Sequence, residues 1–272
     1  MPRTPQSFLY VREFRYRHSV RIARAFTLVE LLVVIAIVAI LLGLLVPSLR
    51  MVMGSARSMK CQVSQRSIAF DFALFADDNL HGDRGDDARK YGSSRFTLET
   101  FQESMYGVDE FWRYGNASTH TLPDASGHDP MRCPEVHGHV SVVSQTACAS
   151  GAVTPAKFVS YTFNSRLHYG EVEKNKGQIG AKLMKLSSSV LNHPNVPLLW
   201  DGDGEEAERR NVVPLFGAPT LDSQVVYAND QYWFPSMRHL GSMNVAFLGG
   251  HVLSTKKPLL ESDWDWGFQP SN

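Results

Sequence analysis

One apolar run near the N-terminus constrains the fold of this 272-residue chain more than any other feature. Residues 31–46 (LLVVIAIVAILLGLLV) are sixteen consecutive residues without a polar side chain. Counted from Phe26, the run would form a helix about 30 Å long, the thickness of a bilayer core. The sequence therefore predicts one membrane-spanning helix. Glu30 is out of place in it, because a carboxylate near the centre of such a helix costs about 2.5–3.5 kcal/mol.

The formal charge is zero overall but is unevenly distributed along the chain. Six arginines and one acid give residues 1–25 a charge of +5, and the remainder carries −5. A basic segment before an apolar helix is typical of a targeting signal and not of a nucleic-acid-binding protein. The positive-inside rule then predicts a cytoplasmic N-terminus. A cleaved secretory peptide is the alternative, but the apolar run is too long for one and lacks a small-residue cleavage site after it.

Helical spacing of apolar residues continues beyond the membrane segment. We expect one helix from about Phe26 to about Ala76, with Pro47 kinking it and an amphipathic second half. Short apolar runs separated by Gly, Pro, Asn and Asp follow and are typical of strands. The sequence thus predicts an α+β protein whose long helix packs on an antiparallel sheet. The expected parts are a leader (1–25), a transmembrane helix (26–48), an amphipathic extension (49–80) and an exported globular head (81–272).

The stretch RAFTLVELLVVIAIVAILLGLLVPSLR closely resembles the cleavage and methylation segment of type IV prepilins and type II secretion pseudopilins. In that family a basic leader ends in a small residue, followed by Phe-Thr-Leu-x-Glu and a long apolar helix. Here the leader ends at Ala25, and Phe26 begins the Phe-Thr-Leu-Val-Glu sequence. The resemblance implies that a prepilin peptidase cleaves between Ala25 and Phe26 and that Phe26 is then N-methylated. The family usually has Gly at the position of Ala25, so slower cleavage is expected.

The resemblance also gives Glu30 a role. Cleavage creates a positively charged amine on Phe26, and Glu30 of a neighbouring subunit can pair with it inside an apolar helix bundle. Such a buried pair contributes little net stability, but it strongly penalises wrong registers. Glu30 is therefore expected to set the axial stagger between subunits, and Pro47 matches a kink proline common in the family. The alternative is an uncleaved signal anchor whose Glu30 reaches the lipid headgroups.

A second resemblance lies near the C-terminus. The stretch MRHLGSMNVAFLGGHVLS is similar to the signature of bacterial prepilin-type processing-associated H-X9-DG proteins. His239 and Gly250 fit that signature, and Gly249 replaces its aspartate. From the residues alone this is a β-hairpin with strands at 244–248 and 251–254, in which the two glycines supply the positive φ angles of a two-residue turn. Asp-Gly would serve the same turn, so the replacement is expected to be structurally neutral.

Cysteine, acidic and histidine side chains give weaker hypotheses. Cys133 and Cys148 are close enough in sequence to close one disulfide loop and leave Cys61 over, but reduced, partly buried thiols fit equally well. The loop DGDGEE offers a weak calcium hypothesis, for which a solvated acidic loop is the better explanation. Its oxygen ligands would be Asp201, Asp203 and Glu205.

Histidines suggest a weak zinc hypothesis. His137 and His139 would share one face of a strand and could join His120, His128 or His251 around a metal, although scattered histidines usually lie on the surface. We therefore expect no cofactor.

No G-x-S-x-G sequence and no phosphate-binding loop occurs, which argues against an enzyme. The sequence predicts a structural subunit of the inner membrane, with a cytoplasmic N-terminus and an exported head. Its helix would assemble into a type II secretion pseudopilus or a type IV pilus-like filament. The implied partners are the membrane, the prepilin peptidase, other pilin or pseudopilin subunits and the inner-membrane platform of the secretion system.

The alternative is a membrane-anchored exported protein that does not polymerise. A metal-binding protein would need His137, His139, His239 or His251 to converge. A carbohydrate-binding protein would use exposed tryptophans as stacking platforms, and the candidates are Trp200, Trp233, Trp264 and Trp266.

Overall fold

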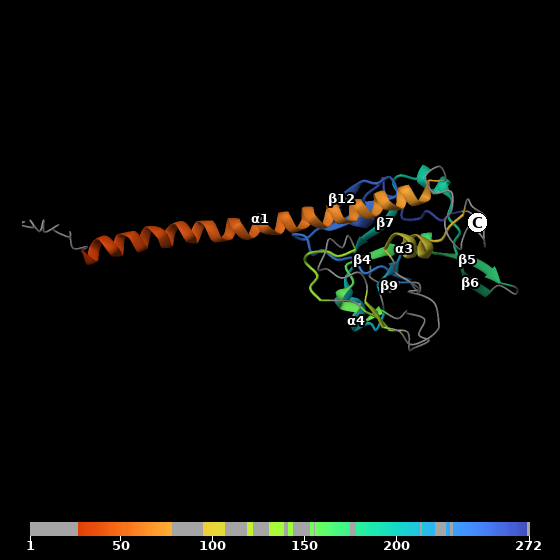
Figure 1. Cartoon of the computed structure of the whole chain (residues 1–272), viewed down its shortest axis with the longest axis horizontal. Helices are drawn as coiled ribbons and strands as arrows, with labels where there is room; N and C mark the ends of the chain where they lie inside the picture. The colour runs from red at the N-terminus through yellow and green to blue at the C-terminus, as the bar shows by residue number, and fades with distance from the viewer. Residues whose placement is uncertain are drawn as a thin grey trace, which may run out of the picture. The chain divides into compact units, whose positions relative to one another are not determined.

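The chain divides into two compact units, Met1–Leu49 and Arg50–Asn272, and the second is called the head below. The computed structural model describes residues 27–77, 95–106, 119–121, 131–138, 141–143, 153–154, 156–174, 178–212, 214–220, 227–228 and 231–270. Helix α1 (Leu28–Ala76) begins in the first unit and ends in the second (Figure 1). The single long helix expected from the sequence is therefore confirmed. The predicted extension at 49–80 is part of the same compact unit as the sheet, up to the end of α1.

The start of α1 is stabilised by a reciprocal pair of side-chain contacts. Thr27 Oγ1 accepts a hydrogen bond from the Glu30 backbone N–H at 3.3 Å. Glu30 Oε2 accepts from the Thr27 backbone N–H at 2.9 Å and from the Thr27 hydroxyl at 2.8 Å. This is a capping box, which satisfies backbone donors that the first helical turn leaves without a partner.

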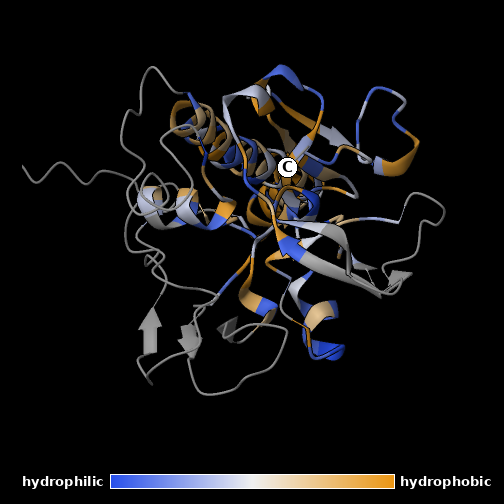
Figure 2. Cartoon of the chain, turned by 90° about the vertical axis from the view of Figure 1, so that its right-hand side faces the viewer, coloured by the Kyte–Doolittle hydropathy of each residue, from blue (hydrophilic) through white to orange (hydrophobic). Residues whose placement is uncertain are grey.

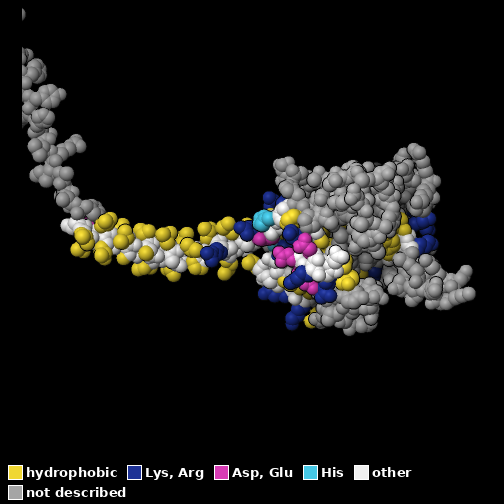
Figure 3. All heavy atoms as spheres, turned by 90° about the horizontal axis from the view of Figure 1, so that it is seen from below, with side chains coloured by type: hydrophobic (Ala, Val, Ile, Leu, Met, Phe, Trp, Pro, Cys, Tyr) yellow, Lys and Arg dark blue, Asp and Glu magenta, His cyan; other side chains and the backbone are white. Residues whose placement is uncertain are grey.

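The first half of α1 leaves its side chains exposed. An 18-residue window within α1 has a mean hydropathy of 3.2, and none of it is buried. Figure 3 shows hydrophobic side chains covering the visible face of this half. By length and composition, α1 is the one helix in the described part of the chain that can cross a membrane.

The second half of α1 buries one face in the head. The buried positions recur every three or four residues, as in an amphipathic helix, and are Cys61, Ser64, Gln65, Ile68, Ala69, Phe72, Phe75 and Ala76. The ring of Phe72 packs edge-on against that of Phe101 in α3 (Leu98–Tyr106), with centroids 5.1 Å apart. This contact belongs to a core cluster that also includes strand residues of the main sheet.

The main sheet has five strands in the order β12-β11-β7-β4-β8. Its strands are β4 (Tyr161–Asn164), β7 (Pro197–Asp201), β8 (Phe216–Gly217), β11 (Met243–Phe247) and β12 (Val252–Thr255). Neighbouring strands are antiparallel except β4 and β8, which are parallel. The α+β architecture is confirmed, but the sheet is mixed and not purely antiparallel. The parallel strand has only two residues, too few to show an alternation in the sequence.

Three strands of this sheet, β4, β7 and β11, are buried along their whole length, so both faces of the sheet are covered. In β11, Ala246 joins the cluster formed with α1, whereas Val245 and Phe247 join a second cluster around Trp200. Successive side chains of a strand point to opposite faces, which explains the division. Figure 2 shows apolar residues concentrated toward the middle of the head.

Smaller elements complete the described head. Three short sheets are formed by β1 (Thr119–Thr121) with β2 (Ser141–Val143) and β3 (Val153–Thr154), by β5 (Tyr169–Lys174) with β6 (Gln178–Leu183), and by β9 (Tyr227–Ala228) with β10 (Gln231–Tyr232). The remaining helices are α4 (Gly204–Arg209) and the 3-10 turns Ala156–Phe158, Ser165–Leu167, Ser188–Asn192 and Pro258–Leu260.

The predicted C-terminal hairpin is present as β11 and β12, but its turn differs from the expectation. Only Gly250 has a positive φ, of 79°, and its N–H donates to the Phe247 carbonyl at 2.9 Å. This fits a three-residue loop in which a left-handed glycine follows a type I turn. A Cβ on Gly249 would lie 2.8 Å from Pro194 Cβ and 2.9 Å from its carbonyl oxygen. Glycine at 249 is therefore required by close packing, and the expected structural neutrality of Asp and Gly there is wrong for this chain.

Candidate functional site

The residues expected to direct processing and assembly lie at the start of the chain. Ala25 and Phe26 are outside the described residues. Glu30 is exposed and held by Thr27. Pro47 lies within α1, which continues through it, and the neighbouring Ser48 hydroxyl donates to the Leu45 carbonyl at 2.8 Å.

The head contains a second notable group of side chains, which sequence reasoning missed as a group. Four potential metal ligands have donor atoms that all lie within 4.8 Å of one another, and none of the four residues is more than 3% exposed. This group, called the buried cluster below, consists of Cys61, Cys133, Asp201 and His239. The ligands come from α1, from residues 131–138, from the end of β7 and from the turn before β11.

Direct contacts link the members of the buried cluster. The Cys61 thiol donates to Asp201 Oδ1 at 3.1 Å. His239 Nε2 lies 3.5 Å from Asp201 Oδ2 and 3.5 Å from Cys133 Sγ. One nitrogen of the imidazole therefore faces both the carboxylate and the second thiol.

Other groups fix the two polar ligands in place. Gln65 Nε2 donates to Asp201 Oδ1 at 3.0 Å, and the Asn244 backbone N–H donates to Oδ2 at 2.8 Å. His239 begins a tight turn in which Leu240 and Gly241 have φ angles of 53° and 80°. Two positive φ angles in succession are the mark of a type I′ turn.

Hydrogen bonding within the cluster shifts its pKa values. A hydrogen bond with Cys61 and the charge of Arg238 lower the pKa of Cys133 to about 5, although burial opposes this. The same hydrogen bond, together with burial, raises the pKa of Cys61. Burial lowers the pKa of His239, but hydrogen bonds to Asp201 and Cys133 outweigh it and raise that pKa to about 9.

The cluster does not have the geometry of a cysteine protease-like triad. In such a triad, the nucleophile and the carboxylate contact opposite nitrogens of the histidine. Here Cys133 and Asp201 both lie at His239 Nε2, and Nδ1 is buried without a hydrogen-bond partner among the described residues. Burial of all four ligands also keeps a substrate away from them in this structure. The arrangement suits ligation better than nucleophilic catalysis.

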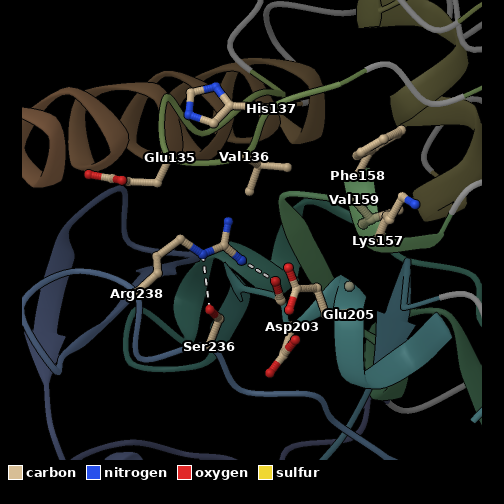
Figure 4. Close-up of a pocket in the computed structure, with 12 residues that line it drawn as sticks. Glu135, Val136, His137, Lys157, Phe158, Val159, Asp203, Glu205, Ser236 and Arg238 are labelled. Atoms are coloured by element: carbon tan, nitrogen blue, oxygen red, sulfur yellow. Dashed lines mark hydrogen bonds between the residues drawn. The ribbon is translucent and has the colours of Figure 1, made fainter. Parts of the chain in front are cut away.

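A pocket of about 410 Å³ is lined by residues 157–159 and by residues close in sequence to Cys133, Asp201 and His239. Figure 4 shows Arg238 reaching across it, between Glu135 and His137 on one side and Asp203 and Glu205 on the other. The Arg238 guanidinium donates to the Ser236 hydroxyl at 3.0 Å and to the Gly202 carbonyl. The lining thus carries both positive and negative side chains.

The structure separates the three carboxylates of the calcium hypothesis. Asp201 belongs to the buried cluster. Asp203 caps α4 by accepting a hydrogen bond from the Glu206 N–H at 3.0 Å, and Glu205 is exposed in the first turn of that helix. Among the described residues, neither Asp203 nor Glu205 belongs to a group of converging ligands, and calcium binding by this loop stays a prediction.

The candidate histidines and the candidate disulfide have different neighbours from those expected. His137 is exposed, His251 stacks on the Phe247 ring at 4.5 Å, and only His239 enters a group of converging ligands. Cys133 is a free, buried thiol beside Cys61. The proposed zinc ligands His139 and His128, the side chain of His120 and the disulfide partner Cys148 lie outside what the structure describes.

Three of the four candidate tryptophans are core residues. Trp200, Trp233 and Trp266 are 0%, 3% and 4% exposed, and Trp264 packs partly buried against them. The Trp200 indole N–H donates to the Trp233 carbonyl at 2.8 Å. The alternative that these three rings form an exposed sugar-stacking platform is therefore wrong.

Comparison with known proteins finds one match. The profile described as the prokaryotic N-terminal methylation motif matches residues 21–46. No curated protein and no solved structure matches the chain significantly. The matched segment contains Ala25, Phe26 and Glu30 but none of the head. Together with the apolar half of α1, it indicates a membrane-anchored, prepilin-like protein.

Proposed function

We propose that this prepilin-like chain is a structural subunit that assembles through α1 into a type II secretion pseudopilus or a type IV pilus-like filament. A prepilin peptidase removes residues 1–25, and the new N-terminus at Phe26 is methylated. The observation that carries the proposal is the methylation-motif match at 21–46, which overlaps the apolar half of α1, a half that has no cover within the described chain. Such a surface needs lipid or other apolar helices around it.

The capping box leaves Glu30 able to meet a neighbour. Both hydrogen bonds from Thr27 go to Glu30 Oε2, and among the described residues no hydrogen bond is made to Oε1. A Phe26 amine from another subunit can therefore bind Oε1 while the capping box persists. This contact would fix the stagger of adjacent helices, because any other register leaves two charges buried without partners.

The topology follows from the charge distribution. The +5 segment before the helix holds the N-terminus in the cytoplasm and sends the head across the inner membrane. There the subunit meets the peptidase, other pilin or pseudopilin subunits and the inner-membrane platform. The hairpin with His239 and Gly250 is consistent with the H-X9-DG subgroup. We assign the head a structural role and no catalytic one.

The decisive experiment is the intact mass and N-terminal sequence of the protein purified from its native membrane. We expect a chain beginning with N-methylated Phe26, and more complete processing in an Ala25→Gly variant. An Ala25→Glu variant is the matched control that should stay uncleaved, because a bulky charged residue replaces the small one. A wild-type chain that still begins at Met1 would refute the processing step and favour a plain membrane anchor.

A further inference from the structure

We propose that the buried cluster is a structural site for one divalent transition metal, and that zinc is the ion it suits best. This goes beyond the proposed assembly function, because it concerns how the head is held together. The nearest sequence-based hypothesis placed a metal among histidines. The structure instead brings one histidine together with two thiols and a carboxylate.

The separations between donor atoms fit tetrahedral coordination. Zinc binds sulfur at about 2.3 Å and nitrogen or oxygen at about 2.0–2.2 Å, so the edges of its ligand tetrahedron are about 3.3–3.8 Å. Two separations match such edges: Cys133 Sγ and Asp201 Oδ2 each lie 3.5 Å from His239 Nε2. Cys61 Sγ lies 3.1 Å from Oδ1, the other oxygen of the Asp201 carboxylate. All four donor atoms lie within 4.8 Å of one another, so shifts of up to about 1 Å would close the tetrahedron around an ion.

The ligand types select the ion. Two thiolates and an imidazole favour zinc and similar soft or borderline ions, whereas calcium and magnesium require mainly oxygen ligands. Four protein ligands without an open position are the mark of a structural zinc site and not of a catalytic one. The near-complete burial of all four residues agrees with that closed type.

The groups around Asp201 are arranged as they are around the carboxylate ligands of known metal centres. Carboxylate ligands are usually oriented by hydrogen bonds from outside the site. Asp201 receives such bonds from the Gln65 side chain and the Asn244 backbone. Without a metal, this carboxylate is fully buried, and His239 is its one ion-pair partner among the described residues. A divalent cation would offset the charges of the carboxylate and the thiolates together.

The site would connect parts of the head that are distant in sequence. Cys61 lies on α1, and its direct partner Asp201 lies 140 residues later at the end of β7. The contact between Cys133 and His239 spans 106 residues. Because such a site exists only in the folded chain, the free energy of metal binding adds to the free energy of folding.

The test uses the full-length protein, purified in detergent without chelators under reducing conditions. Elemental analysis by mass spectrometry should find about one zinc per chain. Zinc is then removed with a chelator and replaced by Co²⁺, whose visible absorption reports tetrahedral geometry and whose sulfur-to-cobalt charge-transfer bands report thiolate ligation. We expect both signals in the wild-type protein.

Matched variants assign the ligands. Cys133→Ser and His239→Gln should each lose zinc, whereas Cys148→Ser and His251→Gln should keep it. If a ligand variant fails to fold, the wild-type cobalt spectrum still decides. Three results would each overturn the proposal. The first is a wild-type protein that binds neither zinc nor cobalt, and the second is zinc retained in both ligand variants. The third is a Cys61–Cys133 disulfide in protein isolated from its native membrane under alkylating conditions. None of these outcomes depends on cleavage at Ala25, so they leave the assembly proposal to its own test.

Discussion

The two halves of α1 are one continuous helix, yet their side chains lie in different environments. From Leu28 to Leu49 the side chains are exposed and almost all apolar, and from Cys61 onward one face is buried in the head. The backbone is helical in both, so helicity alone does not distinguish them. What differs is what the side chains pack against. The second half packs against other parts of its own chain, whereas the first half needs lipid or other subunits around it.

Each half also interacts with an unusual carboxylate. Glu30 lies in the apolar half and, among the described residues, is held only by Thr27, three residues before it. Asp201 is fully buried and contacts Cys61 and Gln65 of the second half. The first acid therefore remains available for a partner outside the chain, while the second is committed to contacts within it.

The largest effect is expected from removing the first acid. Breaking a buried charge pair costs about 3–5 kcal/mol, so Glu30→Leu should reduce assembly at least a hundredfold. The head should keep its folded structure, because Glu30 lies outside that compact unit. The measurement is the fraction of subunits recovered in sheared filaments or as crosslinked multimers in the membrane. Normal assembly of this variant would remove Glu30 from the register mechanism.

One substitution made in each half tests the comparison directly. Ile68 is fully buried, and Ile68→Ala should destabilise the head by about 2–5 kcal/mol through loss of burial and creation of a cavity. Ile40 is 65% exposed, and Ile40→Ala should change the free energy of unfolding of the head by less than about 0.5 kcal/mol. Chemical denaturation of the detergent-solubilised protein, followed by tryptophan fluorescence, measures both. Equal effects would mean that the two halves are energetically alike.

Lowering the pH should destabilise the head and leave the apolar half of α1 unchanged. The group responsible is His168, which is buried in the head with its ring stacked on that of Phe216, the centroids 4.1 Å apart. Burial lowers its pKa from 6.5 to about 3, and this outweighs the Glu99 carboxylate, whose Oε1 lies 3.6 Å from His168 Nε2. A group with a depressed pKa in the folded state contributes stability above its unfolded pKa and loses it as the pH falls. Between pH 7 and pH 5 this loss is about 2 kcal/mol.

Denaturation at several pH values checks the acid effect. The slope with pH should flatten in His168→Gln and persist in His193→Gln, which alters an exposed histidine. The apolar half of α1 has no histidine, so its helicity should not respond over this pH range. An unchanged slope in His168→Gln would assign the acid sensitivity to another group.

The smallest effect concerns the start of α1. Thr27→Val removes the hydroxyl from the capping box and should cost about 0.5–2 kcal/mol, confined to the first turn. Hydrogen exchange of the first backbone amides of α1 should quicken, while amides near Phe72 stay protected. Thr27→Ser keeps the hydroxyl and should behave as the wild type does.

The sequence predicted the apolar half of α1 well, because a lipid-facing helix requires little beyond length and hydrophobicity. The hairpin of β11 and β12 was also predictable from its short apolar run and its two glycines. The requirement for glycine at position 249 was not predictable, because it arises from close packing against Pro194, which lies in another part of the chain. Trp200 and Trp266 were misread as candidate surface residues, because their burial depends on which strands pair.

The buried cluster illustrates the same limit more strongly. Metal sites are recognised in sequences when ligands recur at short, fixed spacings. Here the contact between Cys133 and His239 spans 106 residues, and that between Cys61 and Asp201 spans 140. No local sequence pattern indicates that these four residues converge, because the packing of α1 on the strands brings them together.

The packing of α1 has a consequence for the order in which the protein is made. A ribosome completes this helix early, but Cys61 bonds a residue 140 positions later, and Gln62 bonds Asn244, 182 positions later. The apolar face around Phe72 must therefore wait, without its sheet, until almost the whole polypeptide has been synthesised. Contacts between such distant segments form slowly, and exposed apolar faces promote aggregation during the delay. Nascent subunits with stalled or truncated C-termini should consequently be prime clients of chaperones and quality-control proteases.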